Sequence, residues 1–514
     1  MADYEDPEFV MSQVKLAAAY KAAGDVREAI SLLEQTLAGS QRALGTDHLV
    51  TAAVRNNLAA AYRAAGELAR AVPLLEQAVA DTERALGDED QVTLGFRSNL
   101  AGVYQDTGEV RLAIRLYEQV LAIQERVLGA EDPRILGTRN GLARSCAAAG
   151  EVRRALPLLE RVAADGERLL GADHPDTLSY RNNLAAAYHE QGDLQRAIGL
   201  YEQVLADRQR VLGDDHPATI VSRHNLAGAY GEAGDMRRAV ALHEQALAGH
   251  ERLLGGEHPT TLAVRGDLAA AYQELGDVQR AIPLFERLLA DRRRVLGDDH
   301  PETMASRHLL AGAYQEAGDV QRAIPLYEQV LADRQRILGD DHPHTLTSRD
   351  SVAAYLRKLG ETQAAREVDE DTLARRRRVL GPDHPDTLTS QHNLSQDLSR
   401  LGLHQAARDL DADTLARRRT VHGPDHPWTL ITASNLAADL RRLGGAEAAR
   451  DLDTDTLARR RRVLGDDHPK TLASASNLAK DLEQLGDHRA AEALRAEVAH
   501  RRRGQDEAAP DVGP

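Results

Sequence analysis

A short motif recurs along the chain at a constant interval. Its clearest copy reads Leu-Gly-Asp-Asp-His-Pro, and the next copy of its glycine always follows after 42 residues, as from Gly213 to Gly255. A second glycine recurs with the same period, as at Gly192 and Gly234, and marks twelve units. A period of this length indicates a repeat architecture, in which each unit buries its apolar surface against its neighbours.

Each unit has the pattern of two helices. In the fifth unit Pro175 begins the first helix, because the N–H that proline lacks would be unpaired in a first helical turn. That helix is expected to run to about Gln191, and Gly192 ends it, since glycine tolerates the left-handed conformation of a C-cap. A second helix is expected from about Leu194 to Leu212, with apolar residues at three- and four-residue spacings. The sequence therefore predicts an all-α solenoid of about twelve antiparallel helix pairs.

Composition and charge exclude several classes of protein. The formal net charge is -16, from 80 acidic and 64 basic residues, which disfavours a nucleic-acid partner. No apolar run is long enough to span a membrane, so we expect no membrane partner. One cysteine cannot form an internal disulfide, and the acidic N-terminus lacks signal-peptide features, so we expect a cytoplasmic protein. The preference for arginine over lysine is typical of a GC-rich, bacterial genome.

The repeated residues resemble a known family. The run Asn182–Ala185, the Gly-Asp turn that follows it and the recurring alanine represented by Ala197 are similar to tetratricopeptide repeats. The period and the linker are similar to those of the kinesin-light-chain type, over residues 7–499. The resemblance implies a right-handed superhelix whose first helices line an inner groove. Similar arrays end large bacterial, often actinobacterial, signalling ATPases, but this chain has no Gly-x-x-x-x-Gly-Lys-Ser/Thr phosphate loop.

The units are of two kinds. We assign residues 1–6 to an N-terminal tail, 7–345 to repeats one to eight, 346–499 to repeats nine to twelve and 500–514 to a disordered C-terminal tail. Repeats nine to eleven replace an apolar or aromatic residue of the second helix by an aspartate: Asp369, Asp411 and Asp453. Two interpretations stay open: a later duplication with different but equivalent packing, and a second binding segment with an acidic ladder.

The resemblance also implies where a partner binds. In the family, the asparagine before the motif leucine hydrogen-bonds the backbone of a bound peptide, which suits an amide because it both donates and accepts. This position holds Asn57, Asn99, Asn183, Asn225, Asn393, Asn435 and Asn477. The preceding position, which also borders the groove, holds the further asparagines Asn56, Asn140 and Asn182. Repeats four, seven, eight and nine break the row with Gly141, Asp267, Leu309 and Ser351.

Arginine recurs one step earlier in each of eight consecutive repeats. We include the first five in the candidate site: Arg55, Arg97, Arg139, Arg181 and Arg223. The row continues with Arg265, Arg307 and Arg349. Two interpretations stay open here also: ion pairs between repeats, and a basic strip that binds an acidic peptide through bidentate contacts.

The acidic loops are a candidate for metal chemistry. The Asp-Asp-His-Pro segments and their variants hold nine of the 20 histidines. A metal ion needs ligands that converge within about 2–2.5 Å, whereas neighbouring helices already lie roughly 8–10 Å apart. We therefore expect these loops to turn the chain and to place acids at the positive N-terminus of the next helix, with no metal and no cofactor.

No catalytic motif is present, neither Gly-x-Ser-x-Gly nor His-Glu-x-x-His, so we expect no catalytic residue and no enzyme. The sequence predicts a scaffold that binds a protein or an extended peptide, acidic if the arginines face the groove. The alternatives are a regulatory sensor of a ligand or peptide in bacterial signalling, and a self-assembling structural solenoid. The sequence leaves the oligomeric state open.

Overall fold

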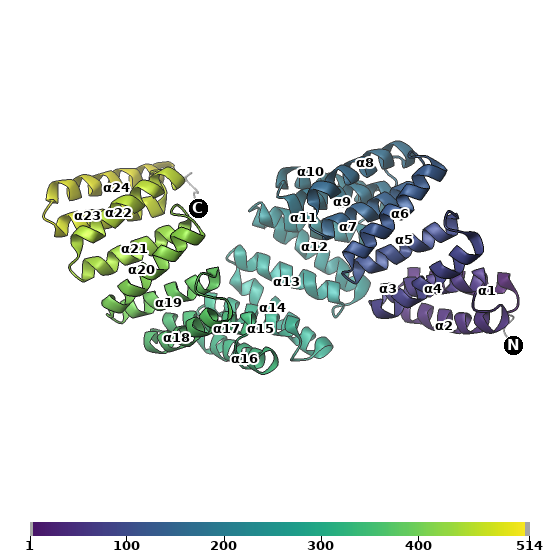
Figure 1. Ribbon diagram of the computed structural model, residues 1–514, viewed down its shortest axis with the longest axis horizontal. Coiled ribbons are helices and arrows are strands. Elements are labelled where there is room, and N and C mark those ends of the chain that lie inside the picture. The colour runs from purple at the N-terminus through teal and green to yellow at the C-terminus, as the bar shows by residue number, and fades with distance from the viewer. Residues whose placement is uncertain (1–3, 509–514) are drawn as a thin grey trace. The chain divides into compact units, whose positions relative to one another are not determined.

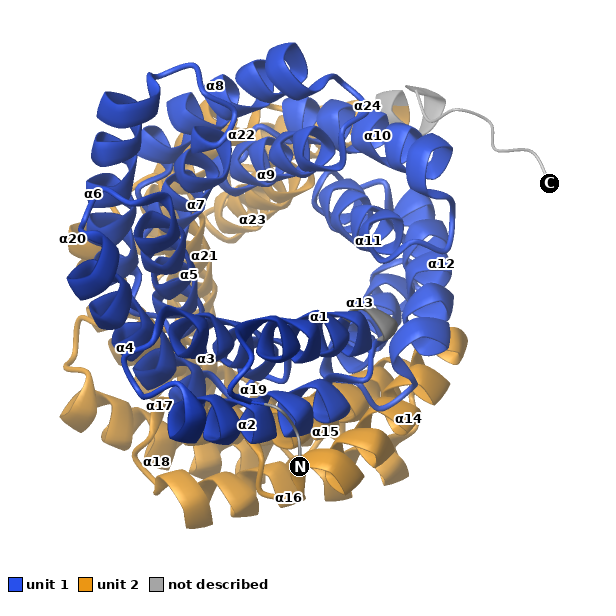
Figure 2. Cartoon of the chain, turned by 90° about the vertical axis from the view of Figure 1, so that its right-hand side faces the viewer, with its two compact units in different colours: residues 1–277 blue, residues 278–514 orange. Residues whose placement is uncertain are grey.

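The computed structural model describes residues 4–508 (Figure 1). The chain forms two compact units, unit 1 (residues 1–277) and unit 2 (residues 278–514), which Figure 2 colours separately. Unit 1 contains α1 (Pro7–Ala23), α2 (Val26–Ala43), α3 (Leu49–Ala64), α4 (Leu68–Leu86), α5 (Gln91–Asp106), α6 (Val110–Leu128), α7 (Ile135–Ala148), α8 (Val152–Leu170), α9 (Pro175–Gln191), α10 (Leu194–Leu212), α11 (Pro217–Glu232), α12 (Met236–Leu254) and α13 (Pro259–Glu274). Unit 2 contains α14 (Val278–Leu296), α15 (Pro301–Glu316), α16 (Val320–Leu338), α17 (Pro343–Lys358), α18 (Thr362–Val379), α19 (Pro385–Arg400), α20 (His404–Val421), α21 (Pro427–Arg442), α22 (Ala446–Leu464), α23 (Pro469–Gln484) and α24 (His488–Ala508).

The predicted all-α solenoid of antiparallel helix pairs is confirmed. Within each unit every helix packs against the helix before it and the helix after it in the chain. We call the odd-numbered helices A helices and the even-numbered ones B helices. In unit 1 the A helices line the inner wall and the B helices lie outside them (Figure 2).

Most A helices begin at a histidine cap, whereas α1 and α5 begin at an aspartate and α7 at Arg134. His216 Nδ1 accepts a hydrogen bond from the backbone N–H of Ala218 at 3.1 Å, and Pro217 occupies the first helical turn. The B helices mostly end at a glycine with positive φ, such as Gly213 at 90°. The same histidine cap recurs at His48, His174, His258, His300, His342, His384, His426 and His468. The linker histidines, considered above as metal ligands, therefore serve as N-caps, a role that Ser, Thr, Asp and Asn fill more often.

The linker acids tie successive linkers together. Asp173, in the linker before α9, accepts a hydrogen bond at 2.8 Å from Arg210, near the end of α10. Glu89 and Arg126 form the same contact at 2.6 Å, again 37 residues apart. These side chains are about half exposed, so solvent screens each pair and its contribution to stability is small.

A single alanine position holds the B helices close to the core. Ala197 of α10 is fully buried among Leu184, Ala185 and Tyr201. The equivalent alanine is 0–1% exposed in every repeat: Ala29, Ala71, Ala113, Ala155, Ala239, Ala281, Ala323, Ala365, Ala407, Ala449 and Ala491. A larger side chain has no room at such a site, because packed interiors tolerate little added volume.

Two boundaries differ from those expected. Helix α24 continues to Ala508 and so includes residues 500–508, which the sequence analysis placed in the C-terminal tail. The rest of that tail, residues 509–514, lies outside the described residues, as do residues 1–3 of the N-terminal tail. The compact units meet between Asp277 and Val278, not at the change of repeat type near residue 346.

We expect Ala197→Leu to lower the free energy of unfolding by about 1–3 kcal/mol, because the added carbons must displace packed neighbours. Urea unfolding followed by circular dichroism measures this. The control is Ala206→Leu at an exposed position of the same helix, which should stay within about 0.5 kcal/mol of wild type. Equal stability of the two variants would contradict the close approach at Ala197.

Candidate functional site

The predicted asparagines of unit 1 are linked in pairs across successive A helices. Asn99 Nδ2 of α5 donates to Asn56 Oδ1 of α3 at 2.8 Å. The same contact joins Asn183 to Asn140 at 3.0 Å and Asn225 to Asn182 at 3.3 Å. The structure therefore combines the two predicted rows into one amide ladder, defined here as these six residues. Asn57 lies apart from it and donates to the carbonyl oxygen of Ala53 within its own helix at 2.9 Å.

The amide ladder keeps hydrogen-bonding capacity. Each donating amide uses one N–H, and within residues 4–508 the carbonyl oxygens of Asn99 and Asn225 accept no hydrogen bond. Asn99 is exposed, and the other ladder residues are half-buried. An amide with an unused N–H and an unused oxygen can take both a donor and an acceptor from an extended backbone.

In unit 2 the predicted asparagines are more isolated. Asn393, Asn435 and Asn477 are half-buried on α19, α21 and α23. Asn435 Nδ2 lies 3.5 Å from Nδ1 of His392, and Asn477 Oδ1 accepts from Lys480 Nζ at 3.3 Å. No continuous ladder of amide pairs forms among these three residues.

The arginine row is enclosed in the helix stack. Arg139 of α7 is 2% exposed and bonds Glu125 of α6 at 2.9 Å and Asp165 of α8 at 3.1 Å. The other four candidates have similar acidic partners, namely Asp81 for Arg55, Glu83 for Arg97, Asp207 for Arg181 and Asp214 for Arg223. These contacts favour the interpretation of ion pairs over that of a basic strip, because the guanidinium groups already bond carboxylates of the chain. They give no support to the expected preference for an acidic peptide.

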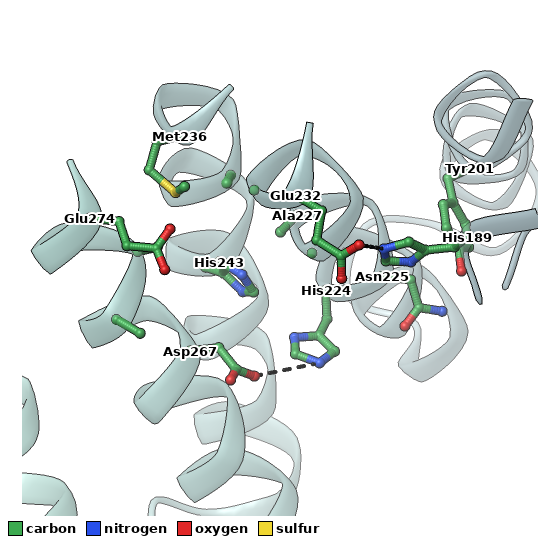
Figure 3. Close-up of a pocket in the computed structure, with 15 residues that line it drawn as sticks. His189, Tyr201, His224, Asn225, Ala227, Glu232, Met236, His243, Asp267 and Glu274 are labelled. Atoms are coloured by element: carbon green, nitrogen blue, oxygen red, sulfur yellow. Dashed lines mark ion pairs between the residues drawn. The ribbon is translucent and has the colours of Figure 1, made fainter. Parts of the chain in front are cut away.

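A hollow of about 570 Å³ lies beside the amide ladder in unit 1, between α9, α11 and α13 (Figure 3). It exists because α11 carries Gly228 and Gly231 at its wall, where a Cβ atom would meet nothing closer than 3.9 Å. The floor includes Tyr201 and Met236. The sequence analysis missed this hollow, although Gly231 stands where other units carry longer side chains such as Arg63, His189 and Gln273.

Histidines and acids surround the mouth of this hollow. His189 Nε2 lies 3.1 Å from Glu232, and His224 Nε2 lies 3.8 Å from Asp267, as the dashed lines in Figure 3 show. Burial, aided by the neighbouring His224, lowers the pKa of His243 to about 4, so that ring is neutral at pH 7. The hollow is lined by the acidic residues Glu232, Asp267 and Glu274 and by no lysine or arginine, so its surroundings are acidic.

The exposed acids form a row. Glu190, Glu232 and Glu274 occupy the same repeat position on α9, α11 and α13 and are exposed. In unit 2 that position holds Glu316, followed by the exposed cations Lys358, Arg400 and Arg442. The side chain at this position is therefore acidic in repeats five to eight and basic in repeats nine to eleven.

The aspartates of the variant repeats are buried. Asp369, Asp411 and Asp453 are each 0% exposed, so they form no acidic surface ladder. Burial raises the pKa of Asp411 to about 7, with the Asp439 carboxylate acting in the same direction and the Ser395 hydroxyl and Arg418 acting against it. Burial also raises the pKa of Asp369 to about 7 and that of Asp453 to about 8.

Other chemistry is limited in the part of the chain that the structure describes. No group of three or more His, Cys, Asp or Glu side chains there is arranged to hold a metal ion. The thiol of Cys146 is buried, and burial raises its pKa. Among the same residues, no helix combines the length and the apolar character needed to cross a membrane.

We expect Arg55→Ala to lower the free energy of unfolding by about 2 kcal/mol, because Asp81, which is fully buried, keeps Arg84 but loses its buried partner. Urea unfolding measures the change. Arg126→Ala, which breaks an exposed pair with Glu89, should lower the free energy of unfolding much less than Arg55→Ala does. A small effect at Arg55 together with a loss of peptide binding would restore the basic-strip interpretation.

The raised pKa of Asp411 predicts a pH dependence. The pKa of this carboxyl group is about 7 in the folded state and about 4 in the unfolded state. The folded state therefore binds the proton more tightly. This contribution to stability is complete below about pH 4 and is lost as the pH rises through about 7. Asp411→Asn lacks this titration. The free energy of unfolding of Asp411→Asn minus that of wild type should therefore increase by about 2–4 kcal/mol between pH 4 and pH 7. Parallel denaturation series measure the difference, and a constant difference would contradict the buried carboxyl.

Comparisons with known proteins agree with this architecture. A tetratricopeptide repeat model matches residues 8–84, 93–165, 234–293, 260–336, 308–378, 351–420, 399–462 and 430–498. A second tetratricopeptide repeat model matches residues 177–218. None of the curated proteins that were compared matches the chain.

Several solved structures are similar to parts of the chain. Nearly identical TPR-like repeats of a Podosopora anserina protein named for kinesin light chain are 40% identical, covering 40% of this chain and 98% of that one, with a TM-score of 0.38. BtubC (BKLC) from P. vanneervenii is 26% identical, covering 46% of this chain and 94% of its own, with a TM-score of 0.39. The apo form of RapI is 10% identical and covers 72% of this chain and 98% of its own, with a TM-score of 0.52. This last likeness concerns the fold alone.

Part of the chain is 40% identical to repeats of a protein named for kinesin light chain. The repeat models match most of the chain, which belongs to the tetratricopeptide repeat family.

Proposed function

We propose that unit 1 is a non-enzymatic binding surface that holds an extended segment of another protein along its A helices. The amide ladder is the observation that carries this proposal. It places partly unused amides at the same repeat position of α5, α9 and α11, which are among the helices that line the inner wall of unit 1. Because repeats three, five and six present the same group at the same position, an extended backbone can meet several of them, passing over the gap at Gly141 in repeat four.

The side chains around the ladder favour a basic segment over an acidic one. The arginines that could have attracted carboxylates are enclosed and paired, whereas Glu190, Glu232 and Glu274 are exposed. The hollow between α9 and α13 has an apolar floor and an acidic rim, which suits a long side chain with an aliphatic stem and a cationic head. A lysine or arginine of the partner has this chemistry.

We expect peptides selected from a random library against the wild-type chain to be enriched in basic residues. Their affinity for the triple variant Asn99→Ala, Asn183→Ala, Asn225→Ala should fall at least about tenfold, since hot-spot polar contacts are worth a few kcal/mol together. Fluorescence anisotropy with labelled peptides measures the affinities, after circular dichroism has shown that the variants are folded.

The matched control replaces the same number of amides on the B helices of the same unit. Gln35, Gln119 and Gln195 are exposed there, and their change to alanine should leave the affinity within about twofold of wild type. Equal weakening by both triple variants, or by neither, would contradict binding at the amide ladder. A library with no enriched peptide would contradict the proposal as a whole and favour the sensor or self-assembly hypothesis.

A further inference from the structure

Unit 2 contains three pairs of buried aspartates at equivalent positions. One member of each pair lies on a B helix, at Asp369, Asp411 and Asp453. The other lies on the next A helix, at Asp397, Asp439 and Asp481. All six side chains are at most 2% exposed. Two carboxylates that are close together and buried repel one another and lose their hydration, so each pair is stabilised by a cation or by keeping a proton.

An arginine of the chain supplies that cation in the first and the third pair. Arg357 Nη1 bonds Asp369 Oδ2 at 2.5 Å and Asp397 Oδ2 at 3.0 Å. Arg441 bonds Asp453 Oδ2 at 2.7 Å and also bonds Asp481. In both cases a single guanidinium group from the preceding A helix joins the two aspartates, as its several planar donors allow.

The middle pair lacks this arginine. Ser399 occupies the repeat position of Arg357 and Arg441, and its side chain is too short to reach both carboxylates. Asp439 has other partners: the Ser399 hydroxyl at 2.7 Å, His404 Nδ1 at 3.0 Å and Arg442 Nη1 at 3.0 Å. Neither oxygen of Asp411 accepts a hydrogen bond of acceptable geometry within the described residues, although this side chain is 0% exposed. The Ser395 hydroxyl lies near enough to lower its pKa, but no guanidinium group among the same residues bonds it.

A cavity of about 200 Å³ lies where the missing arginine would be. Ser399, Asp411 and Asp439 line it. At roughly 30 Å³ per water molecule it holds several waters, and so has room for a planar guanidinium group. Its lining also includes Asn435 and the exposed Arg442 from α21, so it reaches the surface on the A-helix side of the stack.

We propose that this cavity is a binding site for a guanidinium group, which takes the place between Asp411 and Asp439 that Arg357 and Arg441 fill in the neighbouring repeats. A guanidinium ion fits better than an ammonium ion, because its rigid fork of donors reaches two carboxylates on different helices at once. Two arginines of the chain line the cavity without bonding Asp411. Arg442 bonds Asp439 and Ser399, and the exposed Arg400 bonds neither aspartate among the described residues.

Two sources can provide this group. One is an arginine side chain of a bound protein segment, and this source rests on the proposed function. The other is a free guanidinium compound such as agmatine. The existence of the guanidinium pocket does not depend on which source is correct. We therefore test the pocket first with a small guanidinium ion.

The first experiment titrates the full chain with methylguanidinium chloride, and in parallel with methylammonium chloride, at constant ionic strength in a calorimeter. We expect saturable binding of methylguanidinium at one site and at least about tenfold weaker binding of methylammonium. Asp411→Asn keeps the shape of the side chain and removes its charge. It should weaken methylguanidinium binding at least about tenfold. Asp409→Asn, an exposed aspartate of the same helix, is the control and should leave binding unchanged.

Two further variants use the repeat itself. Ser399→Arg should fill the cavity as Arg357 and Arg441 fill theirs, and so abolish methylguanidinium binding. Arg441→Ser should open an equivalent cavity at the third pair and raise the number of sites from one to two. If Arg441→Ser does not fold, the addition of methylguanidinium should restore its helical circular dichroism signal.

The results separate the pocket from the proposed function. The pocket is overturned if methylguanidinium binds wild type, Asp411→Asn and Ser399→Arg equally, or binds none of them, whatever unit 1 does with peptides. If methylguanidinium binds as expected, short peptides Gly-Gly-Arg-Gly-Gly and Gly-Gly-Lys-Gly-Gly with blocked ends identify the source. Tighter binding of the arginine peptide than of agmatine supports a protein partner, and tighter binding of agmatine supports a free ligand.

Discussion

The burial of an apolar stripe on each helix against the neighbouring helices is the constraint on which the rest of the structure depends. A lone helix pair cannot cover its own stripe, so stability comes from contact between successive repeats. The fully buried alanine represented by Ala197 sets how closely the helices approach. Because every repeat meets this constraint in the same way, equivalent positions lie in register, and a residue type repeated in the sequence becomes a row in space.

The stacking of helices also determines which charged side chains are buried and therefore need a partner. The narrow space between helices encloses the arginine row and the aspartates of the variant repeats, and a buried charge is stable only with a partner. Arg139 has Glu125 and Asp165, and Arg357 has two aspartates. Many charged residues of this acidic chain are therefore part of its internal structure and are not available to a partner. The amides of the A helices, which carry no charge, keep free hydrogen-bonding groups.

Both cavities arise at the same position of the repeat. Gly231 of α11 and Ser399 of α19 occupy the same position of the repeat. Other repeats carry long side chains there, such as Arg63 or Arg441. In unit 1 the short residue opens a hollow with an acidic rim, and in unit 2 it leaves two aspartates without their arginine. A regular array thus produces specific sites where one repeat departs from the common pattern, since the neighbouring helices keep their places.

The period, the two glycines and the prolines of the sequence were enough to predict the helix pairs, and α9 and α10 begin and end where expected, because caps and turns are local properties. The positions of the asparagines were also predicted, but not their pairing. The sequence could not show that Arg55 and Asp411 are buried, because a charged residue is exposed unless other helices cover it. Such coverage depends on residues far along the chain, as Arg55 bonds Asp81, 26 positions away. Only the tertiary structure brings those helices together, and with them it decides which charges are paired, which amides are free and where a cavity is left.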